Sequence, residues 1–218
     1  MLPLRFDNST KSALNLLCIG AHCDDIEIGC GGTILKLISE KEVAAVKWVV
    51  FTSTEERAAE AKDSADQFLQ NVQNKEVIIH NYKDGFLPYL GYEVKSSFEE
   101  LKKDFTPDVI LTHYRNDRHQ DHRLISDLTW NTYRNHFILE YEIPKYDGDL
   151  GNPNFFVPLS RELVDKKIDI LHESFKSQTA KHWFDRETFL SLIRIRGLEA
   201  ASPSNYAEAF HARKINFM

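Results

Sequence analysis

The chain has 218 residues, with 27 Lys and Arg against 33 Asp and Glu, so its formal net charge is −6. Hydrophobic residues make up 42% and charged residues 28%, a balance typical of folded globular proteins and not of disordered or fibrous ones. The negative charge excludes the basic surface that duplex nucleic acid requires, and the length suits one domain, which we expect over residues 1–218.

Short apolar runs alternate with amphipathic stretches along the chain. In chain order, these patterns predict a strand over residues 15–19, a helix beginning near Gly31, a strand over 44–51, a helix over 55–71, a strand over 77–80, a helix over 98–105 and a strand over 108–112. Residues 137–158 predict a strand and an irregular loop, and residues 161–177 and 186–195 predict two helices. The alternation indicates an α/β fold, a Rossmann-like three-layer sandwich with a mainly parallel sheet.

Other features set the expected location. No apolar run approaches the ~20 residues of a membrane helix, so we expect no membrane insertion. The N-terminal residues lack the apolar stretch of a secretory signal, which favours a cytoplasmic location. Cys18, Cys23 and Cys30 form no CxxC pair, which indicates reduced thiols.

Metal-ligating side chains follow two of the predicted strands. His22 and Asp25 come after the first strand, and His119 and His122 come after the fourth, each pair three residues apart. On a helical turn each pair projects to one side. Because parallel sheets bind ligands beyond the carboxyl ends of their strands, both pairs are expected at the same edge. A metal could be held between them.

Imidazole and carboxylate ligands suit zinc or another first-row cation such as Fe²⁺, and a catalytic zinc keeps three protein ligands and an open position. That leaves Asp24 as a candidate general base and one histidine as an acid or oxyanion partner. Alone, an Asp-Asp pair is usually a helix cap and an HxxH pair is usually a surface or core feature. Their conjunction at one sheet edge is what favours a site.

Four segments resemble one family. Residues 22–33, HCDDIEIGCGGT, resemble the AHPDD-type signature of the PIG-L/LmbE-like zinc de-N-acetylases, and RHQDHR at 118–123 resembles their HxDH motif. Arg57 and Glu60 resemble an R..E pair, and RIRG at 194–197 followed by YAEAF at 206–210 resembles an ending of many bacterial members. Cys23 replaces the usual proline and Ile26 is an extra residue, but neither change removes a ligand.

The resemblance implies a role for each matched position. It implies zinc ligands at His22, Asp25 and His122, a general base at Asp24, an oxyanion or leaving-amine partner at His119, and a histidine-orienting carboxylate at Asp121. The implied reaction is removal of acetyl from an N-acetylated amino sugar or sugar conjugate.

Candidate substrate-binding residues are fewer and less specific. Arg57, Arg118 and Arg123 lie near the two motifs and could recognise a phosphate or carboxylate, although they could equally be solvated surface residues. Tyr206 and Glu208 join them through the matched ending.

Three other functions stay open: a nucleotide-binding transferase of Rossmann type, a zinc amidohydrolase on a non-sugar acyl amide, and a non-catalytic binding protein. The glycines at 29–32 fail the GxGxxG spacing of a dinucleotide loop, since Ile34 stands where the third glycine would fall. We interpret them as close packing beside the metal site.

Overall fold

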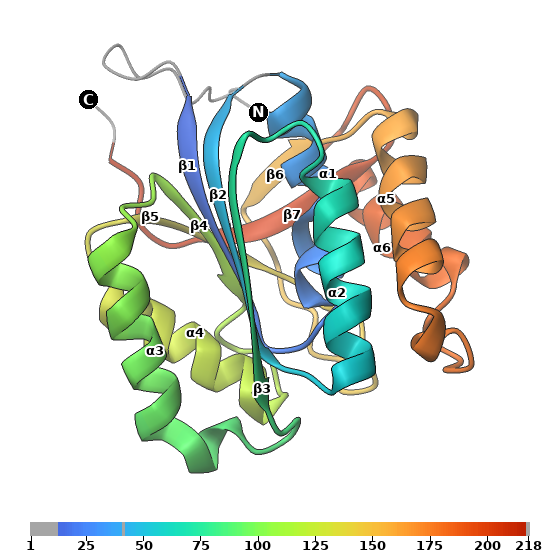
Figure 1. Cartoon of the computed structure of the whole chain (residues 1–218). Coiled ribbons are helices and arrows are strands. Elements are labelled where there is room, and N and C mark those ends of the chain that lie inside the picture. The colour runs from blue at the N-terminus through green and yellow to red at the C-terminus, as the bar shows by residue number, and fades with distance from the viewer. Residues whose placement is uncertain (1–12, 41, 217–218) are drawn as a thin grey trace.

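Seven strands form one sheet in the computed structural model, which describes residues 13–40 and 42–216 (Figure 1). In chain order the strands are β1 Leu14–Gly20, β2 Val43–Thr52, β3 Asn74–Tyr82, β4 Val109–His113, β5 Phe137–Tyr141, β6 Phe155–Pro158 and β7 Ala207–Ala212. The spatial order is β3-β2-β1-β4-β5-β7-β6. β1 to β5 are parallel, and β7 runs antiparallel between β5 and β6. The predicted, mainly parallel sheet is confirmed.

Helices cover both faces of this sheet. They are α1 Asp25–Ser39, α2 Glu55–Phe68, α3 Gly91–Asp104, α4 Gln120–Thr132, α5 Arg161–Ser174 and α6 Arg186–Glu199, with the short 3-10 helices η1 Leu87–Leu90 and η2 Lys176–Gln178. α1, α2, α5 and α6 lie on one face, and α3 and α4 lie on the other (Figure 1). Alternate β1 residues pack into the two layers: Leu16 faces one and Leu17 the other.

The predicted helix start near Gly31 is wrong, because α1 already begins at Asp25. The carboxylates of Asp25 and Glu27 in the first turn favour a helix N-terminus. The glycines then lie inside the helix, where distant side chains occupy the space of a missing Cβ. A Cβ on Gly29 would lie 2.2 Å from Tyr141 Cδ2, and the other glycines face Phe68 and Leu159. The interpretation as close packing is confirmed.

Two further helices differ from the prediction. α3 begins at Gly91, well before residue 98, and α4 over Gln120–Thr132 was not predicted as an element. The predicted strand and loop within residues 137–158 are confirmed as β5 and the segment after it, but the second strand in this range, β6, was not predicted.

The order of the strands reverses between β1 and β4. β2 and β3 lie to one side of β1, while β4 and β5 lie to the other. Ligands in such sheets bind beyond the carboxyl ends of strands where the order reverses. None of the helices in residues 13–40 and 42–216 is long and apolar enough to cross a membrane. The three cysteines are buried free thiols.

Candidate active site

Three predicted ligand side chains converge at the switch point between β1 and β4. His22 Nδ1 lies 3.2 Å from Asp25 Oδ2 and 3.0 Å from His122 Nε2. His122 Nε2 lies 3.5 Å from Asp25 Oδ1. Ligands about 2.0–2.1 Å from a tetrahedral ion stand about 3.3 Å apart, so these spacings, in which each Asp25 oxygen faces one of the two rings, suit a zinc-sized cation.

The outer nitrogens of both rings are held by carboxylates. Asp117 Oδ2 lies 2.9 Å from His122 Nδ1. Asp84 Oδ1 and Asp121 Oδ2 lie 3.1 and 3.3 Å from His22 Nε2. An ionised carboxylate only accepts hydrogen bonds, so each ring, when neutral, places its proton on the outer nitrogen. The two inner lone pairs therefore face each other and the Asp25 carboxylate, which is the donor set of a cation site.

Further ligand combinations surround this set. Triples of ligand atoms within 4.8 Å of one another form from His22, His119 and His122, from Asp25, His113 and His122, and from His22, Asp84 and Asp121, so the three predicted ligands are spread over these triples. His113 Nε2 already accepts the backbone N–H of Ala21 at 2.9 Å, so its lone pair is engaged. His119 Nδ1 accepts the N–H of Asp121 at 3.3 Å, which leaves Nε2 available as a hydrogen-bond donor.

The facing histidines have opposite pKa shifts. Burial lowers the pKa of His22, but the carboxylates of Asp25 and Asp121 outweigh it and raise that pKa well above its usual value. Burial, with the neighbouring His113 ring, lowers the pKa of His122 to about 3. Without a cation, a proton on His22 therefore makes the contact between the two rings favourable. A bound cation must displace that proton.

Asp24 lies beside the ligand set but is engaged elsewhere. It occupies the N-cap position of α1 without a side-chain capping bond, because its Oδ2 lies 3.0 Å from Arg57 Nη2. Arg57 is fixed in turn by Glu60 at 3.1 Å and by the ring of Phe175. Burial raises the pKa of Asp24, and the Arg57 guanidinium opposes that shift. Asp24 is thus a buried carboxylate paired with a guanidinium beside the ligand set.

A cavity of about 640 Å³ opens over these groups. Its lining includes His22, Asp24, Asp25, Arg57, His119 and His122 at the ligand end, and Asn81, Lys83, Asp84, Lys145, Tyr146, Lys181 and Trp183 on the outer walls. This size is in the range of small-molecule sites, about 300–1,000 Å³. The cavity can hold a ligand much larger than an acetyl group.

Two of the three predicted arginines lie elsewhere. Only Arg57 lines this cavity. Arg123 donates to the carbonyl oxygen of Arg118 and lines a separate hollow beside α4. Arg118 contributes through its backbone: its N–H donates to the Asp149 carboxylate at 2.6 Å.

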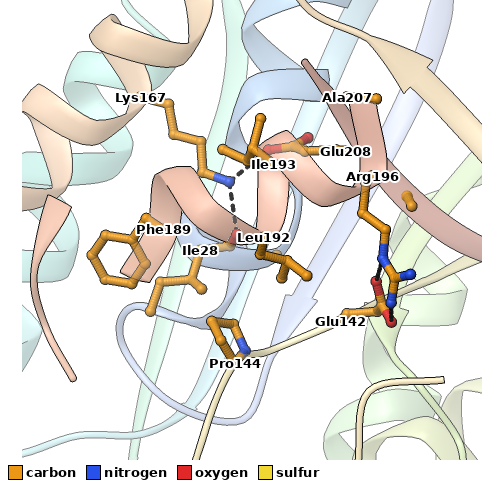
Figure 2. Close-up of a pocket in the computed structure, with 12 residues that line it drawn as sticks. Ile28, Glu142, Pro144, Lys167, Phe189, Leu192, Ile193, Arg196, Ala207 and Glu208 are labelled. Carbon is orange, nitrogen blue, oxygen red and sulfur yellow. Dashed lines mark hydrogen bonds and ion pairs between the residues drawn. The ribbon is translucent and has the colours of Figure 1, made fainter. Parts of the chain in front are cut away.

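Tyr206 and Glu208 are not brought to the cavity either. Tyr206 Oη accepts from the exposed Arg161 guanidinium at 3.0 Å. Glu208 is buried and accepts the N–H groups of Gly32 and Thr33 at 2.8 and 2.6 Å. Its carboxylate also pairs with Lys167 Nζ at 2.7 Å (Figure 2). Glu208 therefore ties α1 and α5 to β7.

Sequence reasoning missed Asp117, His113 and Lys145. Asp117 stands two residues before His119 and five before His122, so its spacing was a usable signal for a carboxylate beside the ligand turn. His113 ends β4 and stacks on His122 with ring centroids 3.9 Å apart. Lys145 reaches Asp117 from the segment after β5, a contact that no local pattern reveals.

Comparison with known proteins points to one family. The family profile described as "PIG-L: GlcNAc-PI de-N-acetylase" matches residues 17–133, more than half of the chain. The uncharacterized deacetylase YaiS of Escherichia coli K12 is 28% identical over 144 residues, which cover 63% of this chain and 78% of YaiS.

Two solved structures share the fold at low identity. N,N'-diacetylchitobiose deacetylase from Pyrococcus horikoshii aligns with a TM-score of 0.69 and 23% identity over 95% of this chain and 87% of its own. The 4-carboxy-2-hydroxymuconate hydratase GalB from Pseudomonas putida KT2440 aligns with a TM-score of 0.71 and 16% identity over 94% and 98%. The fold thus carries more than one chemistry, and the site must decide the reaction.

Proposed function

The chain belongs to the PIG-L family of de-N-acetylases, and on that premise we propose that it is a metal-dependent hydrolase that removes the acetyl group from an N-acetylated amino sugar or sugar conjugate. The expected cation is zinc, with Fe²⁺ as the alternative. His22, Asp25 and His122 would hold it.

One observation carries the proposal: the side chains of His22, Asp25 and His122 approach one another at 3.0–3.5 Å, while Asp24 beside them is paired with Arg57. A structural metal site needs no additional buried carboxylate that opens to a cavity. A hydrolytic site does, because the attacking water must lose a proton.

Asp24, Arg57 and His119 would each have a separate role in the reaction. A divalent cation at the site would polarise the acetyl carbonyl and lower the pKa of the attacking water. Asp24 would take the proton from that water, and Arg57 would hold the Asp24 carboxylate in place at 3.0 Å. His119, which lines the cavity, would stabilise the oxyanion or protonate the leaving amine nitrogen.

Asp121 would act on a histidine and not on the substrate. Its Oδ2 lies 3.3 Å from His22 Nε2, and both of its oxygens accept backbone N–H groups, from Gly85 at 2.7 Å and Leu87 at 3.1 Å. A carboxylate held this way fixes the tautomer of the ring that it touches. Asp121 is therefore proposed to turn His22 Nδ1 toward the cation.

The glycine packing weighs against the transferase alternative. A phosphate-binding loop needs glycines that open to a ligand. Here Gly29 faces Tyr141, and Gly32 faces Leu159 and the Glu208 carboxylate. A non-sugar acyl amide stays the second candidate substrate, because the same metal chemistry would hydrolyse it.

Acetate release tests the proposal. Purified protein reconstituted with zinc is incubated with free, nucleotide-linked and lipid-linked N-acetylglucosamine and with a non-sugar N-acetyl amide of similar size. Acetate from at least one sugar, absent after chelation and restored by zinc, supports it. Release from the non-sugar amide alone would favour the second candidate, and release from no member would contradict the proposal.

A further inference from the structure

Lys145 makes a buried double ion pair at the edge of the metal centre. Its Nζ lies 2.8 Å from Asp117 Oδ2 and 2.6 Å from Asp149 Oδ2. The side chains are 14%, 2% and 7% exposed. Water therefore screens these contacts far less than it screens a surface pair.

Both carboxylates connect the Lys145 ammonium to the turn that carries His119 and His122. The Asp117 oxygen that Lys145 contacts is the one that lies 2.9 Å from His122 Nδ1. The other Asp117 oxygen accepts the N–H of His119 at 2.8 Å. Asp149 accepts the N–H of Arg118 at 2.6 Å. One ammonium thus anchors residues 117–119 through two carboxylates.

The segment that carries Lys145 is itself fixed at both ends. Arg196 donates to both carboxylate oxygens of Glu142 at 2.7 and 2.8 Å (Figure 2). The same guanidinium donates to the carbonyl oxygen of Gly151 at 3.0 Å. Residues 142 and 151 are therefore held by one buried side chain from α6. Lys145 projects from a held loop and not from a free one.

We infer that Lys145 is a positioning residue for the metal centre, which acts through Asp117 to hold the His122 ring with Nε2 toward the cation. This inference rests on the proposed cation site but not on the identity of the substrate. Outer contacts of this kind fix ring orientation and typically change metal affinity 10–100-fold.

Two other cavity lysines provide matched controls. The Lys83 ammonium lies over the Phe86 ring, and the Lys181 ammonium lies over the Trp183 ring. Neither makes an ion pair with a carboxylate within residues 13–40 and 42–216. Loss of either charge leaves the contacts of Asp117 intact.

The test measures the zinc dissociation constant by competition with a chromophoric chelator, with no substrate present. Lys145→Met is expected to weaken zinc binding about 10–100-fold, Lys145→Arg to restore part of the loss, and Lys181→Met to leave affinity unchanged. In an Asp117→Asn background, Lys145→Met should add little, because the two residues act in one chain of contacts. Unchanged affinity in Lys145→Met, or an undiminished effect in the Asp117→Asn background, would overturn the inference.

Asp149→Asn is the second variant, for the case in which Lys145→Met does not fold. It keeps the ammonium but weakens one of its two anchors, so a smaller loss of zinc affinity is expected. Wild-type affinity in Asp149→Asn would then count against the inference. Acetate release is measured separately, so a protein that binds zinc as expected but releases no acetate would contradict only the proposed function.

Discussion

His22 and His122 point ring nitrogens at each other across 3.0 Å, although 100 residues of chain separate them. Each ring is tied on its far side by carboxylates, Asp117 for His122 and Asp84 with Asp121 for His22. In the cation-free protein a proton on His22 stabilises the contact, because the carboxylates of Asp25 and Asp121 outweigh burial and raise the pKa of His22. A cation bound as proposed would therefore compete with this proton for the same pair of nitrogens.

This competition predicts that zinc affinity falls as pH falls. Below the raised pKa of His22, binding must displace one proton, so the apparent dissociation constant should rise about tenfold per pH unit. Chelator competition at several pH values measures it, and titration calorimetry in two buffers of different ionisation enthalpy counts the protons released. A zinc affinity that does not change with pH would show that binding displaces no proton from His22.

Substitution of Asp24 should sharply lower turnover but not zinc binding, whereas substitution of His122 should abolish zinc binding. Asp24→Asn keeps the shape of the side chain but removes the base, so zinc content should stay stoichiometric while acetate release falls about 10²–10⁴-fold. His122→Ala removes one of the three inner atoms and should release zinc. Metal analysis and acetate release on the same samples separate the two. An active Asp24→Asn variant would end its assignment as the base.

The fold class could be predicted from the sequence because strand periodicity is local. The start of α1 could not, since helical glycines at 29 and 31 are tolerated only because Tyr141 and Phe68 pack into their space from distant segments. The same difference between local patterns and long-range contacts applies to the candidate site. Both histidine motifs were visible as residue spacings, whereas the Lys145 contact to Asp117 depends on how the loop after β5 returns over the sheet.

Gly29 and Gly91 should respond oppositely to alanine. At Gly29 a Cβ would overlap the Tyr141 ring at 2.2 Å, so Gly29→Ala is expected to cost about 1–3 kcal/mol of unfolding free energy. At Gly91, the first residue of α3, no atom lies within 4 Å of an added Cβ, so Gly91→Ala should gain about 0.4–1 kcal/mol. Urea denaturation of both variants measures this. Equal effects would show that α1 is not packed this closely.

Glu208 should matter for stability and not for substrate. Glu208→Gln leaves the buried Lys167 ammonium without its carboxylate, and breaking such a pair typically costs about 3–5 kcal/mol (Figure 2). Urea denaturation should show this loss, while the KM of the folded variant stays near that of the wild type. A raised KM with unchanged stability would show instead that Glu208 contributes to substrate binding.

His211 makes folding stability depend on pH away from the metal centre. Its ring stacks on Tyr114 with centroids 3.8 Å apart, and burial, with the nearby Arg196 charge, lowers its pKa to about 4. The unfolded chain takes up this proton near the ordinary value of about 6.5, so the folded state loses stability as pH falls from about 6.5 toward 4.

His211→Phe keeps an aromatic ring against Tyr114 but removes the titrating group. Its unfolding free energy should therefore fall less between pH 7 and pH 5 than that of the wild type, while the two proteins run parallel above about pH 7.5. Urea denaturation in the presence of a chelator isolates the effect, because zinc release at low pH then contributes to neither protein. Identical losses between pH 7 and pH 5 would mean that the folded protein accommodates the protonated ring, through a movement of Tyr114 or of Arg196.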